Sequence, residues 1–104
     1  MSIDKTAVIK EALKKLEEVL QGKFELIAKT APLQLRLLTE NALIIKDPDN
    51  GLNDKQRENL HQLQIRNLQD FVLGTKALSI VAAEQAAEAV WEVIINAIGK
   101  AITH

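Results

Sequence analysis

The stretch Asp47-Pro48-Asp49-Asn50-Gly51-Leu52-Asn53-Asp54 is the one place in the chain where turn-forming residues cluster. Pro presets the backbone of a turn, Gly tolerates positive φ, and Asp and Asn side chains bond to nearby backbone groups. On both sides of this stretch, apolar residues recur at helical spacing. The sequence therefore predicts an interhelical turn at 47–54 that joins two long antiparallel arms, about 5–45 and 54–102.

The first arm begins with a clear amphipathic pattern. Its apolar seam consists of Ile9, Leu13, Leu16, Leu20 and Ile27, with charged residues on the opposite face. We predict a helix over 5–29, with Gly22 as a weak point inside it, because the apolar pattern keeps its phase beyond this residue. Pro32 either opens a new helix, capped by Thr30 or Ala31, or bends one long helix.

The segment 33–45 has no single apolar face. Its first three leucines alternate as in a strand, whereas its later apolar residues recur at helical spacing. We favour a helix, because Gln34, Arg36 and Glu40 are weak strand formers and the chain offers no second strand for pairing. Since its apolar residues point in nearly every direction, we expect this helix to be largely buried.

The second arm contains two helical runs. Asn53 or Asp54 starts the first of them, and Gln56 stands where a capping-box partner belongs. Gly74 either ends that helix or is crossed by a continuous one. The run 76–102 has a broad apolar arc, so we expect it to contact more than one neighbouring helix.

These patterns predict a single all-α domain over 1–104. If Pro32 and Gly74 break the arms, the fold is a four-helix bundle. If they only bend them, it is a two-helix hairpin with arms of about 65–70 Å. A lone hairpin would hide only one seam on each helix, and the chain has more apolar helical surface than that. Either the arms fold over into a bundle, or several chains associate.

Composition excludes several classes of function. The net charge is −1, with eight acids and eight bases through Asn50 and six acids and five bases after it, so no basic field attracts nucleic acid. Aromatic residues make up 3%, and Cys is absent. Charges near the N-terminus and the lack of an apolar run of about 18 residues argue against a signal peptide or a membrane span. We expect a soluble, cytoplasmic protein without a membrane partner.

The sequence also lacks the usual equipment for catalysis. It contains no Gly-rich phosphate loop, nucleophile elbow or metal-spaced His cluster. The acidic residues of the turn approach a calcium-loop spacing, but Gly51 stands at the fifth place where that motif needs Gly at the sixth. We therefore predict a non-enzymatic protein with no catalytic residue, cofactor, metal or small-molecule substrate.

Six residues are candidates for an interface with a partner protein. His61 and Gln64 are polar residues within an apolar helical face, where such residues fix register or partner choice as readily as they fill a half-buried place. An acidic row in the last helix is either a solvated stripe or a docking surface for a basic partner, and Trp91 beside it is either an interface anchor or a core residue. The row consists of Glu84, Glu88 and Glu92.

The leading hypothesis is a structural or scaffold subunit that self-assembles by helix–helix association into a homo-oligomer, or joins another helical protein. Its basis is the excess of apolar helical surface. The first alternative is a small helical adaptor or inhibitor, of the secretion-chaperone, antitoxin or phage-accessory type. The second is a membrane-active protein, which is disfavoured because the acidic row makes insertion into lipid costly.

Overall fold

The computed structural model describes residues 4–74 and 78–103, with side chains as far as Lys100. The described residues form four α-helices and one short 3-10 helix. The order is α1 (Lys5–Leu20), η1 (Gln21–Leu26), α2 (Ala31–Lys46), α3 (Asp54–Leu73) and α4 (Ile80–Thr103). The prediction of an all-α fold is confirmed.

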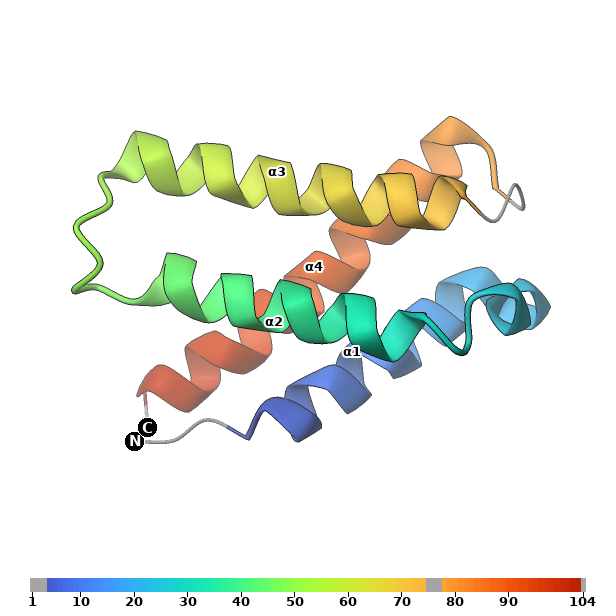
Figure 1. The fold of residues 1–104 in the computed structure, drawn as a ribbon, viewed down its shortest axis with the longest axis horizontal. Coiled ribbons are helices and arrows are strands. Elements are labelled where there is room, and N and C mark those ends of the chain that lie inside the picture. The colour runs from blue at the N-terminus through green and yellow to red at the C-terminus, as the bar shows by residue number, and fades with distance from the viewer. Residues whose placement is uncertain (1–3, 75–77, 104) are drawn as a thin grey trace.

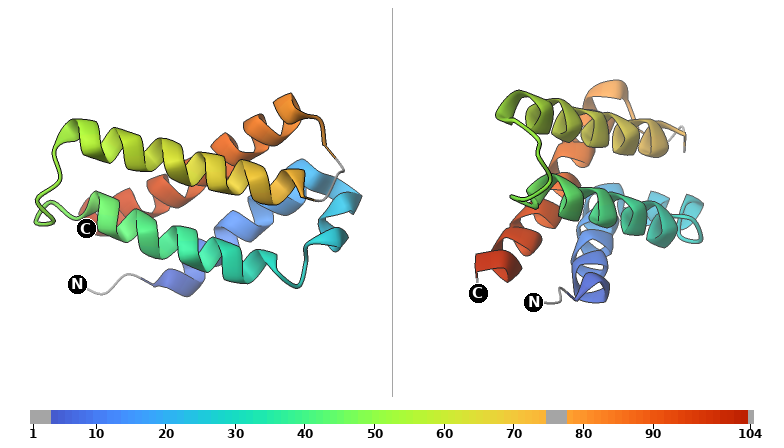
Figure 2. Two further views of the ribbon diagram at one scale, coloured as in Figure 1. Left: turned by 45° about the horizontal axis from the view of Figure 1, so that its top comes forward. Right: turned by 60° about the vertical axis from the view of Figure 1, so that its left-hand side comes forward.

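The helices form two layers. The antiparallel pair α2 and α3 lies in front of α1 and α4 in Figure 1, and the two turned views in Figure 2 show the same arrangement. Helix α4 packs against α1, α2 and α3, which confirms the expectation that it contacts several neighbours. The extents are 39 × 27 × 17 Å, far short of a hairpin arm of about 65–70 Å. The four-helix bundle is the arrangement that forms.

The prediction of one helix over 5–29 is wrong, because α1 ends at Leu20. The next residue, Gln21, has φ 53° and ψ −133°, a left-handed conformation that breaks the helical hydrogen-bond ladder. The chain continues as η1, none of whose residues is buried. The break therefore falls next to Gly22, which the apolar pattern places inside the helix.

Pro32 opens α2 rather than bending a longer helix. The helix begins at Ala31 with Thr30 as the N-cap residue, so Pro32 lies in the first turn. Its missing N–H is one of the groups that have no partner inside a helix at this end. Of the two roles that the sequence allowed for Pro32, the structure selects the helix start.

The second arm is broken at Gly74. Asn53 caps α3, since its Oδ1 accepts the Gln56 N–H at 2.8 Å, and Gln56 Oε1 accepts the Asn53 N–H at 2.9 Å. Gly74 is the C-cap residue. Helix α4 starts at Ile80, where the Ser79 hydroxyl oxygen accepts the Ala82 N–H at 3.1 Å. The predicted start at 76 lies outside the described residues.

The core runs along the inner faces of all four helices. Helix α4 supplies its centre, where small and branched residues are fully or almost fully buried: Ala83, Ala87, Val90, Ile94 and Ile98. Leu16 of α1, Leu35 and Leu38 of α2 and Leu68 of α3 pack into the same cluster. Among the described residues, none of the helices combines the length and hydropathy that a membrane span requires.

A single arginine organises the predicted turn. Arg57 Nη1 donates to Ile45 O at 2.7 Å, and its Nε donates to Leu52 O at 3.3 Å. Its Nη2 donates to Asp47 O at 3.2 Å and to Asn50 Oδ1 at 3.1 Å. These bonds tie the end of α2 and the turn to the first turns of α3. Within the described part of the chain, no group of three or more His, Cys, Asp or Glu side chains is placed to hold a metal ion.

Candidate functional site

The outer face of α2 carries an apolar stripe that the bundle does not cover. Leu33, Leu37 and Ile44 are 66%, 52% and 58% exposed. They stand four and seven residues apart, so they line one side of the helix as the a and d residues of a coiled-coil seam do. We call these three residues the α2 stripe. The expectation that 33–45 is largely buried is wrong for this face.

The α2 stripe is exposed because of the way α2 packs in the bundle. Its inner face contacts the other three helices and buries Ala31, Leu35, Leu38, Thr39, Ala42 and Ile45. The Thr39 hydroxyl is satisfied there, since it donates to Leu35 O at 2.8 Å. The α2 stripe lies on the side opposite this inner face, where no fifth helix is present among the described residues. Helix α2 is therefore apolar on two faces, and the bundle uses only one.

The neighbouring helix α3 extends this surface. Leu63 is 48% exposed, and the half-buried Leu60 packs at the edge of the core. A shallow cleft of about 120 Å³ lies between the two helices, lined by Asn41, Ile44, Ile45, Leu60 and Gln64. An apolar cleft beside exposed Leu and Ile side chains suits insertion of a side chain from another helix.

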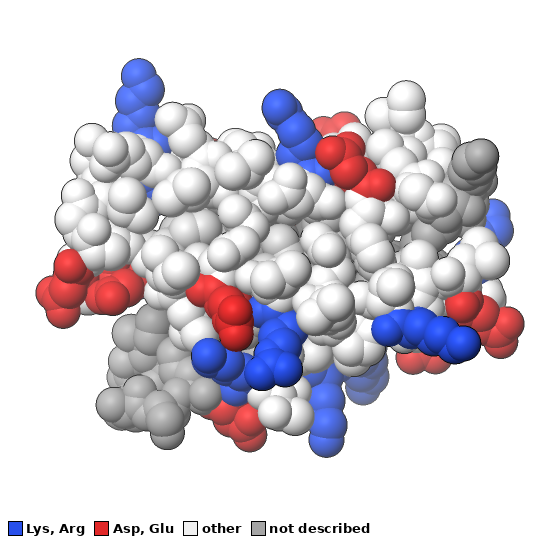
Figure 3. Space-filling view, in the orientation of Figure 1, with Lys and Arg blue, Asp and Glu red and all other residues white. Residues whose placement is uncertain are grey.

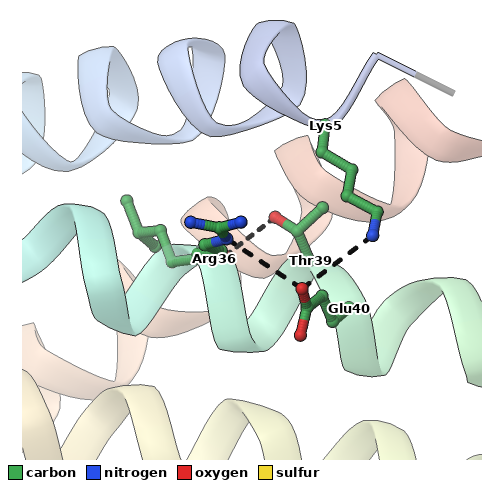
Figure 4. Close-up of polar contacts among 5 residues, drawn as sticks. Lys5, Arg36, Thr39 and Glu40 are labelled. Atoms are coloured by element: carbon green, nitrogen blue, oxygen red, sulfur yellow. Dashed lines mark hydrogen bonds and ion pairs between the residues drawn. The ribbon is translucent and has the colours of Figure 1, made fainter.

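Charges lie around this surface rather than across it. Figure 3 shows an uncharged area over the middle of the face formed by α2 and α3, with charged side chains at its edges. The Glu40 carboxylate lies between Lys5 of α1, at 3.9 Å, and Arg36 of α2, at 4.0 Å (Figure 4). These side chains are between 44% and 67% exposed, so the ion pairs contribute little to stability.

Gln64 lies inside the bundle. It is 5% exposed, and its Oε1 accepts a hydrogen bond from Asn41 Nδ2 at 2.9 Å. This bond joins α3 to α2 beside the cleft and satisfies a buried polar group that would otherwise be costly. The position suits the register role that the sequence suggested, within the chain rather than towards a partner.

His61 and Trp91 form a pair between α3 and α4. Trp91 Nε1 donates to His61 Nδ1 at 3.1 Å, and the rings meet edge to face with centroids 5.7 Å apart. Trp91 is only 4% exposed, so its ring packs in the core. Burial and the nearby charge of Lys46 lower the pKa of His61 below its usual 6.5, against an opposing effect of Glu58. The neutral imidazole is the form that accepts the Trp91 hydrogen bond.

The acidic row lies apart from these polar pairs. All three of its residues are exposed on α4, whereas Trp91 on the same helix faces inwards. The structure therefore separates the row from Trp91, which the sequence places beside it. The row is Glu84, Glu88 and Glu92.

Sequence reasoning missed the three residues of the α2 stripe as a site, because apolar residues of the segment 33–45 point in nearly every direction and its two apolar faces look alike. The spacing of Leu33, Leu37 and Ile44 was a usable signal. Comparison of the chain with family models, with curated proteins and with solved structures finds no match. What the molecule itself defines is an all-α bundle with an uncovered apolar helix face.

Proposed function

We propose that this protein acts without catalysis, by helix–helix association, as a structural or scaffold subunit that self-associates through the α2 stripe. The observation that carries the proposal is a coiled-coil-spaced row of half to two-thirds exposed Leu and Ile on an otherwise folded bundle. Contiguous exposed apolar patches on globular proteins mark interaction sites more often than single exposed residues do.

The size of the stripe sets the expected affinity. Fully burying one Leu or Ile side chain is worth about 1.5–3 kcal/mol, so covering the exposed parts of the stripe on two copies offers about 5–10 kcal/mol. Association costs at least about 4 kcal/mol in lost freedom of motion. The stripe alone therefore supports a net gain of at most about 6 kcal/mol, which corresponds to a dissociation constant of about 40 μM, and contacts from Leu63 would tighten it.

Sedimentation velocity tests the proposal over a concentration series from about 10 μM to 1 mM, which extends to both sides of this value. We expect the apparent mass to rise above the 11.5 kDa of one chain as concentration increases. Leu33→Glu is expected to abolish the rise, because it places a charge within the stripe.

The matched control is Leu26→Glu. Leu26 is 65% exposed, against 66% for Leu33, but it belongs to η1 and lies outside the stripe. Self-association that persists in Leu26→Glu and disappears in Leu33→Glu supports the proposal. A wild-type chain that stays a monomer at every concentration would overturn it, as would equal effects of the two substitutions.

A further inference from the structure

The α2 stripe has approximate twofold symmetry along the helix. Leu33 and Ile44, the ends of the stripe, are about 16 Å apart along the axis, and Leu37 lies within about 2 Å of the midpoint between them, which falls between Leu38 and Thr39. Eleven residues of helix return to within about 20° of the starting direction, so the two side chains leave the helix on the same side. A second α2 that runs antiparallel would place Leu33 of each copy against Ile44 of the other.

The charges beside the stripe favour the same orientation. Arg36 and Glu40 lie on the side of the stripe that faces α1, and both are substantially exposed. If two α2 helices pack in parallel about a twofold axis, Arg36 and Glu40 of the two copies lie on opposite edges of the contact, so they cannot pair with each other. If they pack antiparallel about the same midpoint, Arg36 lies within one residue, about 1.5 Å along the axis, of the height of Glu40 in the other copy.

From this symmetry and charge pattern we infer that the occupant of the α2 stripe is a second copy of the chain, docked antiparallel with its own α2 across a twofold axis. This inference rests on the proposed self-association. The contact uses the same surface on both copies, so it closes into a dimer and does not propagate into a filament. Two Arg36–Glu40 pairs, one from each copy to the other, border an apolar centre made of the two stripes.

Cysteine cross-linking tests the orientation, because the chain has no Cys of its own. Leu33→Cys and Ile44→Cys chains are mixed in equal amounts, oxidised gently and digested with trypsin. The two sites fall in different tryptic peptides, 30–36 and 37–46, so mass spectrometry distinguishes every disulfide. Antiparallel docking predicts an excess of the mixed disulfide over the proportion that random pairing gives, since only facing residues meet the distance that a disulfide needs.

Leu26→Cys mixed with Leu33→Cys is the control and should give random proportions. Disulfides joining like sites, in excess over the mixed one, would overturn the antiparallel inference while leaving self-association intact. Wild-type chains that remain monomeric in the sedimentation series would overturn both proposals. The two failures are therefore distinguishable.

Charge reversal supplies an independent test. Arg36→Glu alone places acids against acids across the dimer, and Glu40→Arg alone places bases against bases, so each is expected to raise the dissociation constant about tenfold. An equimolar mixture of the two variants should recover near wild-type affinity. Lys14→Glu, an exposed change on α1, should alter the constant less than about twofold. A mixture that binds no better than its components would overturn the pairing.

Discussion

Arg57 offers the sharpest test of how this fold is held together. Its guanidinium donates four hydrogen bonds: to the carbonyl oxygens of Ile45, Asp47 and Leu52, and to Asn50 Oδ1. Two of these carbonyls belong to the last turn and the C-cap of α2, where helix carbonyls have no partner within the helix. Arg57→Ala removes all four donors at once.

The magnitude follows from the number of bonds and from their exposure. A hydrogen bond from a charged donor is worth about 1.5–3 kcal/mol in protected surroundings. Arg57 is only partly buried and water reaches much of the turn, so we take about 0.5–1 kcal/mol for each bond. The expected loss is about 2–4 kcal/mol, or a fall in Tm of about 10–20 °C for a chain of this size. Arg57→Lys is expected to recover less than half of this lost stability, because a single ammonium group cannot make the divergent hydrogen bonds of the planar guanidinium.

Urea unfolding followed by circular dichroism at 222 nm measures this loss, with Arg66→Ala as the control. Arg66 is exposed on the same helix, and its side chain makes no hydrogen bond or ion pair with another described residue. Its replacement should change stability by less than about 0.5 kcal/mol. The assigned role of Arg57 is wrong if Arg57→Ala lowers stability no more than Arg66→Ala does, or if Arg57→Lys is as stable as the wild type.

Three further predictions concern other parts of the chain. Gln21→Gly should raise stability by about 1 kcal/mol in thermal melts, because Gly relieves the left-handed strain at φ 53°; an unchanged or lower Tm contradicts this. Stability should be full above pH 6.5 and fall as pH drops below it, because the lowered pKa of folded His61 lets the unfolded chain bind the proton first. Urea titrations of wild type and His61→Gln between about pH 5 and 8 check this. If the free energy of unfolding changes equally with pH in both proteins, the role of His61 is disproved. Asn41→Ala should lower the free energy of unfolding by about 1–2 kcal/mol, because it leaves the buried Gln64 amide without its hydrogen-bond partner. In a double-mutant cycle, Asn41→Ala combined with Gln64→Leu should recover most of this loss.

Local signals predicted those parts of the fold that are decided locally. The capping box of Asn53 and Gln56 involves residues three apart, so its pattern is visible in the sequence and its bonds form as expected. Whether Pro32 and Gly74 break or bend a helix depends on the packing of distant helices, and the sequence left both outcomes open. Gln21 was missed for another reason, since Gln has no preference for the left-handed conformation that it adopts there.

The candidate surface was only partly predictable. Counting apolar residues showed that the chain has more apolar helical surface than one seam can hide, but it did not show which face stays uncovered. That choice depends on which side of α2 meets the other three helices. The contact of His61 with Trp91 joins residues thirty apart in the sequence, and the bonds of Arg57 cross the turn to α2. No periodic pattern records either of these contacts.

Under the proposed self-association, the two faces of α2 have separate roles, one in folding and one in association. The inner face contributes Leu35, Leu38 and Ile45 to the core, and its loss would unfold the bundle. The α2 stripe lies on the opposite side and contributes little to the stability of one chain, because its side chains remain exposed to water after folding. A charge introduced at Leu33 or Leu37 can therefore disrupt association while the monomer keeps its fold. A surface that adds so little to folding, yet keeps Leu and Ile at coiled-coil spacing, is explained better by a partner helix than by the needs of the bundle.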